Sequence, residues 1–128
     1  MKLLLDTCTF LWIIGGSAKL SQTALELFED PGNEVYLSVA SSWEMAVKSA
    51  LGKLRLPAPA WRFIPTQRIA HGIESLTIDE ESALQLERLP PLHNDPFDRM
   101  MVCQSIVHGL TILTPDEFIS QYPVRVAW

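Results

Sequence analysis

Three shortages in this sequence each exclude a class of protein. With only two cysteines, Cys8 and Cys103, the chain is not a disulfide-rich secreted domain, and we expect both thiols to be reduced and buried in the core. Its net charge of −5 does not suit a protein that binds nucleic acid by charge alone. The chain also lacks the roughly 18 consecutive apolar residues of a transmembrane helix, and Asp6 interrupts the first apolar run before a signal peptide could form. We therefore expect a soluble, cytoplasmic protein.

Several catalytic motifs are absent as well. The three histidines, His71, His93 and His108, do not have the spacing of zinc ligands. There is no glycine-rich phosphate loop and no Gly-x-Ser-x-Gly elbow. These absences argue against zinc enzymes, nucleotide-binding domains of the phosphate-loop type and serine hydrolases.

The sequence does contain enough apolar residues for one core. Hydrophobic residues make up 48% of its 128 residues, and a chain of this length buries about two-thirds of its surface on folding. We find no linker and no internal repeat, so we expect a single domain over residues 1–128.

Strand patterns alternate with helix patterns along the chain. The predicted strands are 3–5, 35–39, 76–78, 110–114 and 124–126. The predicted helices are 8–14, a helix opened by Ser21 and closed by Pro31, a helix from Ser41 to Leu54, and 61–70, 80–89 and 95–108. Such alternation is typical of a largely parallel sheet covered on both faces. The predicted fold class is α/β, a three-layer α/β/α domain with a mostly parallel sheet of four to five strands.

Acidic residues follow the predicted strands. Asp6 ends the first strand, Glu44 lies in the helix after the second, and Asp116 follows the strand 110–114. In a parallel sheet these three positions come to the same edge, beyond the carboxyl ends of the strands. Asp95 and Asp98 open the helix that leads into the strand 110–114, and topology rules do not place them at that edge.

Each of these acids also has an ordinary structural explanation. Asp6 can cap the helix that follows it, and Asp95 before Pro96 reads as a helix cap as well. Ser41 and Glu44 fit a capping box, and Glu44 can instead pair with Lys48 one turn later. Asp116 can open a turn.

The coincidence of the acids is what indicates a site. Clustered carboxylates repel one another and raise one another's pKa, so a fold has no structural reason to gather them. A divalent cation removes that penalty, and an all-carboxylate set suits Mg²⁺ or Mn²⁺ better than zinc. Mg²⁺ keeps several waters and leaves room for phosphate oxygens, which is the chemistry of a metal-dependent nuclease.

Four segments carry a recognisable set of motifs, in this order along nearly the whole chain: Leu3–Thr7, Ser38–Glu44, His93–Arg99 and Leu113–Asp116. Together they resemble the PIN-domain family, and most of all its VapC-like branch, the toxins of bacterial toxin–antitoxin systems. The segment His93–Arg99 is the most specific. The resemblance implies a PIN-like parallel-sheet fold and an Mg²⁺- or Mn²⁺-dependent endoribonuclease that hydrolyses phosphodiester bonds in RNA.

The resemblance also assigns roles to individual residues. The four acidic positions of the family, catalytic and metal-binding, match Asp6, Glu44, Asp98 and Asp116, and Asp95 is an extra acid, a helix cap that can lie close to the metal. Thr7 and Thr114 are expected to orient carboxylates or waters behind the metal ligands. Arg99 is expected to contact either phosphate or a neighbouring acid. Cys103 and Gln104 depart from the small residues usual in that helix, which bears on packing.

The resemblance further implies partners. VapC-like toxins form dimers and pair with a small antitoxin, so we expect a homodimer, an RNA substrate and an antitoxin protein. The segment Trp12–Ile14 and the helix around Trp43 are candidate apolar surfaces for the antitoxin, although core packing is the better explanation of each residue taken alone.

Two alternative functions remain open. The first is an aspartate-nucleophile phosphohydrolase: the segment Leu5–Thr9 begins like its Asp-x-Asp motif, but Cys8 occupies the position of the second aspartate. A receiver domain ranks lower still, because only Asp6 is available for the paired acids that it needs at the first strand. The non-enzymatic alternative is an RNA- or protein-binding module on the same fold.

Overall fold

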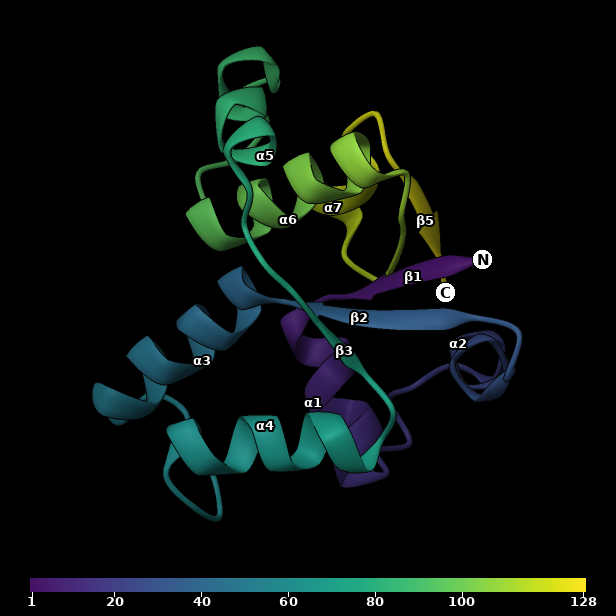
Figure 1. Ribbon diagram of the computed structural model, residues 1–128, viewed down its shortest axis with the longest axis vertical. Coiled ribbons are helices and arrows are strands. Elements are labelled where there is room, and N and C mark those ends of the chain that lie inside the picture. The colour runs from purple at the N-terminus through teal and green to yellow at the C-terminus, as the bar shows by residue number, and fades with distance from the viewer.

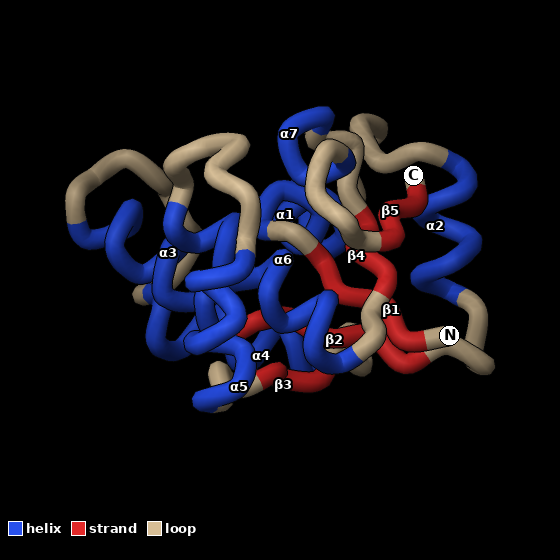
Figure 2. Tube along the Cα trace, turned by 90° about the horizontal axis from the view of Figure 1, so that it is seen from above, coloured by secondary structure: helices blue, strands red, loops and turns tan.

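A computed structural model describes residues 1–128 as one five-stranded sheet in which every neighbouring pair of strands is parallel. The strand order is β3-β2-β1-β4-β5. The strands are β1 (Lys2–Leu5), β2 (Glu34–Ser38), β3 (Glu74–Leu76), β4 (Thr111–Leu113) and β5 (Arg125–Ala127). They lie next to one another in Figure 2. The predicted α/β class with a parallel sheet is confirmed.

Helices cover both faces of the sheet (Figure 1). They are α1 (Thr7–Gly15), α2 (Gln22–Glu29), α3 (Val39–Ala50), α4 (Ala60–Ala70), α5 (Glu80–Gln85), the 3₁₀ turn η1 (Leu86–Arg88), α6 (Pro96–His108) and α7 (Glu117–Ser120). In Figure 1, α1, α3 and α4 lie below the sheet, and α5, α6 and α7 lie above it. None of these helices combines the length and apolar character that crossing a membrane requires.

The central strand β1 shows how one sequence supplies two cores. Successive side chains of a strand point to opposite faces. Leu3 and Leu5 therefore join the core under α1 to α4, together with Phe10 and Met45, whereas Leu4 joins the core under α6 and α7. All three leucines are completely buried. Because helices cover both faces of the sheet, both faces of its central strand have to be apolar. Leu3, Leu4 and Leu5 meet this requirement.

The order of the strands determines where a site is expected. From β1 the chain moves outward through β2 to β3, then returns to form β4 on the other side of β1, followed by β5. The order therefore reverses between β1 and β4. In open parallel sheets the crevice at this switch point, beyond the carboxyl ends of the strands, is where ligands bind. Asp6 follows β1 there, and Thr114 follows β4.

Two predicted elements begin two residues too late. Helix α3 begins at Val39, capped by the side chain of Ser38, rather than at Ser41. The expected capping box of Ser41 and Glu44 therefore does not form, because both residues already lie inside the helix. Strand β3 is Glu74–Leu76, two residues before the predicted strand 76–78, because it pairs in register with β2.

The two cysteines differ in their surroundings. Cys103 lies on α6 and is completely buried in the core, as expected. Cys8 is exposed, and the expectation that it is a core thiol is wrong. The apolar residues around Cys8 in the sequence do not bury it, because α1 turns only part of its surface to the sheet: Thr9 and Phe10 are its buried residues.

Gln104 joins three elements through a buried amide. Its Oε1 accepts a hydrogen bond from the hydroxyl of Ser38 at the end of β2, and its Nε2 donates to the carbonyl of Thr77 after β3, at 3.1 Å. The side chain is completely buried. The amide on α6 thus ties the helix to the carboxyl ends of two strands.

Replacing Gln104 with leucine should destabilise the fold. The volume is nearly kept, but two buried polar groups lose their partners, which costs about 2–4 kcal/mol of unfolding free energy. Urea unfolding measures the change, with Gln121→Leu, an exposed position, as the matched control. Equal stability of the two variants would contradict the role assigned to Gln104.

Candidate functional site

Asp6 lies at the switch point, held by two elements. It caps α1 by accepting a hydrogen bond from the amide of Thr9 on Oδ1, at 2.7 Å, and its Oδ2 accepts one from the hydroxyl of Thr114, beyond β4. The residue is only 7% exposed. Burial raises the pKa of its carboxyl; the hydrogen bonds from Thr114 and Thr9 oppose this, and the charge of Asp116 adds to it. The carboxylate of Asp6 is therefore oriented by hydrogen bonds, and no lysine, arginine or histidine side chain pairs with it.

Thr114 connects Asp6 to Asp116. While its hydroxyl donates to Asp6, the same oxygen accepts a hydrogen bond from the amide of Asp116, at 3.1 Å. Asp116 in turn caps the short helix α7, its Oδ1 accepting from the amide of Phe118 at 2.7 Å. One buried threonine thus fixes both the carboxylate of Asp6 and the backbone that carries Asp116.

Glu44 reaches the site from α3. Its Oε1 accepts a hydrogen bond from the hydroxyl of Thr7, at 2.6 Å, and its Oε2 pairs with the ammonium of Lys48 one turn later, at 2.5 Å. The hydrogen bond from Lys48 to Glu44 raises the pKa of the lysine. Glu44 is 6% exposed. Because Thr7 is the residue after Asp6, this bond places the start of α1 against α3.

Asp98 has the most perturbed carboxyl. It lies in the first turn of α6, and burial together with the charge of Asp95 raises its pKa to about 6. The charges of Glu44 and Asp116 raise it further, and a hydrogen bond with His93 opposes them. Asp98 is therefore within electrostatic reach of acids on α3 and before α7, a placement that topology rules alone did not provide.

Asp95 has the cap role expected of it. Its Oδ1 accepts hydrogen bonds from the amides of Phe97, at 2.9 Å, and Asp98, at 3.0 Å. Pro96 occupies the first helical position, where its missing N–H costs nothing. Asp95 acts on the site through its charge, as the largest neighbouring charge that raises the pKa of Asp98.

The acids lie near one another, but their side chains are not in the geometry of a metal site. No three His, Cys, Asp or Glu side chains stand close enough together to hold an ion between them. The donor set nevertheless fits Mg²⁺ or Mn²⁺, because it consists of carboxylate oxygens and because Mg²⁺ takes only one or two of them directly. Burial of Asp6 and partial burial of Asp98 raise the pKa of both carboxyls, and a bound cation would relieve this cost.

Arg99 does not form the expected ion pair with a neighbouring acid. Its Nη1 donates to the carbonyls of Pro90, at 2.9 Å, and His93, at 3.5 Å, and to the hydroxyl of Tyr122, at 3.1 Å. No acid pairs with it. The guanidinium therefore holds the loop before α6 against the C-terminal segment, and a phosphate contact would have to compete with these three bonds.

His93 and Tyr122 are site residues that sequence reasoning did not assign. The imidazole of His93 makes a hydrogen bond with the hydroxyl of Tyr122 through Nδ1, at 2.7 Å, and lies 3.4 Å from Oδ2 of Asp98 through Nε2. Tyr122 is 3% exposed. The position of His93, just before the helix that carries Asp98, could have indicated a role in the site. Nothing in the sequence could have indicated Tyr122, because only the fold brings it next to His93.

The raised pKa of Asp98 makes the stability of the metal-free protein depend on pH. The unfolded value is 3.8 and the folded value about 6. Below pH 3.8 both states hold the proton; above it the unfolded state ionises first, so stability falls as pH rises toward 6 and then levels off. We expect this group to remove about 2 kcal/mol between pH 4.5 and 7. Urea unfolding with a chelator present, compared with Asp98→Asn, measures it; an identical pH dependence in both proteins would contradict the assignment.

Comparisons with known proteins agree with this architecture. The family model described as PIN domain matches residues 3–124. Ribonuclease VapC16 of Mycobacterium tuberculosis is 36% identical over 53 residues, which cover 41% of this chain and 38% of that protein. The match therefore spans well under half of the length of that relative.

Solved structures of toxin–antitoxin complexes share the fold over nearly the whole chain. A chain of VapBC2 from Rickettsia felis, bound to a DNA fragment from its promoter, superposes with a TM-score of 0.71 at 12% identity, covering 99% of this chain and 98% of its own. A chain of DNA-bound VapBC from Salmonella typhimurium gives a TM-score of 0.69 at 18% identity, with 99% and 97% coverage. At such low identity these likenesses establish the fold.

Proposed function

Because the chain belongs to the PIN-domain family, we propose that it is an Mg²⁺- or Mn²⁺-dependent endoribonuclease and the toxin of a toxin–antitoxin pair. The observation that carries the nuclease proposal is the gathering of acids at one edge of the sheet: Thr114 joins Asp6 to the backbone of Asp116, and Thr7, the residue after Asp6, binds Glu44. The charges of Glu44 and Asp116 also raise the pKa of Asp98. These acids come from separate segments of the chain. A fold that gathers them without a cation opposes its own stability.

Each acid has a defined part in this proposal. Asp6, Asp98 and Asp116 would hold the cation with Glu44, and Asp95 would add negative charge behind Asp98. When bound, Mg²⁺ or Mn²⁺ supplies the positive charge that neutralises phosphate oxygens and makes water easier to deprotonate.

The remaining side chains orient these carboxylates. Thr114 donates to Oδ2 of Asp6, and Thr7 donates to Oε1 of Glu44, so both carboxylates are held at one oxygen by a hydroxyl. His93 lies beside Oδ2 of Asp98. Such bonds behind the ligands set their direction and typically change metal affinity or activity about 10- to 100-fold when removed. With a pKa of about 6, Asp98 is largely ionised at neutral pH and can accept a cation there.

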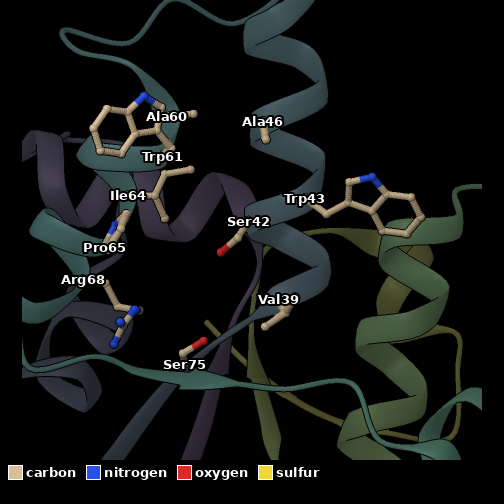
Figure 3. A pocket seen from close by; sticks show the side chains of 10 residues that line it. All are labelled: Val39, Ser42, Trp43, Ala46, Ala60, Trp61, Ile64, Pro65, Arg68 and Ser75. Carbon is tan, nitrogen blue, oxygen red and sulfur yellow. The ribbon is translucent and has the colours of Figure 1, made fainter.

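The antitoxin part of the proposal is supported by the surface of α3 and α4. Trp43, Trp61 and Leu51 are exposed apolar side chains. Between the two helices runs a groove lined mainly by apolar groups, with Ala46 on one wall and Ile64 on the other (Figure 3). Such surfaces commonly mark protein contacts. Trp12, in contrast, packs on Trp128 with ring centroids 5.7 Å apart. The proposal extends to a homodimer of the toxin.

The test of the proposal is cleavage of labelled total RNA by the purified protein. We expect defined fragments when Mg²⁺ or Mn²⁺ is present, and the same assay on labelled DNA decides whether that substrate is also cut. Absence of cutting over a broad set of RNAs with either metal would favour the non-enzymatic binding module. An open reading frame for a small protein directly upstream of the gene would test the toxin assignment separately.

A further inference from the structure

The site has an aromatic residue on its rim that no role described so far uses. Phe118 lies on α7, two residues after Asp116, and is 56% exposed. Its backbone amide is bound by the carboxylate of Asp116. Exposure of a single apolar ring needs no explanation in itself, and it is the position of this ring beside the acids that bears on function.

The ring of Phe118 is stacked with that of His93. The two rings are nearly parallel, with an interplanar angle of 2° and centroids 5.8 Å apart. His93 itself lies against Oδ2 of Asp98 and makes a hydrogen bond with Tyr122. The flat surface of Phe118 therefore stands one ring away from the candidate metal ligand Asp98 and is backed by a side chain that is held on both of its nitrogens.

The charges around this site do not favour RNA binding. The chain carries a net charge of −5, and the two basic residues that adjoin the acids in the sequence are engaged: Lys48 with Glu44, and Arg99 with carbonyls and Tyr122. Proteins that bind single strands combine phosphate attraction with stacking of bases on aromatic rings. Where phosphate attraction is weak, base stacking has to supply more of the affinity.

Resting on the proposed ribonuclease function, we propose that Phe118, backed by His93, stacks against an unpaired nucleobase next to the phosphate to be cut. The stacked base has to be unpaired, so this contact would not form with a duplex. Bases in a helix are already stacked on one another and present no free face to a side chain.

The experiment uses stacking itself as the signal. Short single-stranded RNAs of about ten nucleotides, each with the fluorescent base 2-aminopurine at a different position, are titrated with Asp98→Asn protein in Mg²⁺, so that no cleavage interferes. We expect quenching of the probe at one or two positions. Phe118→Ala in the same background should abolish that quenching and weaken RNA binding about 5- to 100-fold.

Three controls separate stacking from other effects. Phe118→Trp should restore quenching, and Phe118→Leu, which is apolar but not aromatic, should not. Leu84→Ala removes an equally exposed apolar side chain on α5 and should change nothing. With the cleaving protein, Phe118→Ala should raise KM and leave kcat largely unchanged.

The outcomes distinguish this proposal from the nuclease proposal. Unchanged RNA affinity and quenching in Phe118→Ala would overturn the stacking role, even if the wild type cuts RNA efficiently; it would also be the result if the ring served a protein partner. An equal loss of affinity for a duplex of the same sequence in Phe118→Ala would show that the ring does not act on an unpaired base and would overturn the stacking role. Loss of quenching in Phe118→Ala together with no cleavage by the wild type would support the stacking role and contradict the nuclease.

Discussion

Asp98→Asn should lower the rate of RNA cleavage by a factor on the order of 10³. Asparagine keeps the shape of the side chain and removes the charge that would attract the cation. Folding should survive, because no lysine or arginine pairs with Asp98 and only His93 contacts it, at 3.4 Å. Since the carboxyl is buried among other acids, the melting temperature of the metal-free variant should equal that of the wild type or exceed it by a few degrees.

The control for this variant is Glu29→Gln. It removes the same kind of charge from an exposed position at the end of α2, and we expect it to cut RNA like the wild type. Equal cutting by Asp98→Asn, prepared in the same way, would mean that the activity comes from a contaminant or from other residues. A fall of several degrees in its melting temperature would show that Asp98 serves the fold and would count against the acidic cluster.

Removal of the divalent cation should abolish cleavage completely. With EDTA the carboxylates are left without a positive charge to attract phosphate, and the site repels RNA. Added Mg²⁺ or Mn²⁺ in excess over the chelator should restore cutting, whereas Zn²⁺ should restore it poorly, because the donor set holds no histidine or cysteine ligand pattern. The measurement is the rate of fragment formation from labelled RNA as the metal is titrated.

Thermal unfolding gives a readout of the same site that does not depend on activity. A ligand that binds only the folded state stabilises it by about 2.7 kcal/mol when present at 100 times its dissociation constant. Mn²⁺ should therefore raise the melting temperature of the wild type by several degrees and that of Asp98→Asn much less. Cleavage that persists in EDTA, or an equal shift in both proteins, would contradict a metal site that includes Asp98.

The helix caps show what local sequence rules could predict. Asp6, Asp95 and Asp116 each accept hydrogen bonds from amides two or three residues later, as their positions before a helical pattern indicate. These contacts depend on neighbours in the sequence and on little else. The predicted start of β3 was wrong for the opposite reason, because pairing with the distant strand β2 sets its register. The start of α3 was wrong because its cap, Ser38, lies inside the segment 35–39 that was predicted as a strand.

The sequence by itself determined the alternation of strands and helices, and with it the parallel sheet that brings Asp6 and Asp116 to one edge. Only the tertiary structure decided that Asp98 joins them, that Arg99 turns to the loop before α6, and that Cys8 is exposed. The physical reason is distance along the chain: Thr114 and Asp6 are 108 residues apart, and Tyr122 and His93 are 29 apart. Contacts of this kind have no local signature, because they form only when the packing of separate elements has been settled.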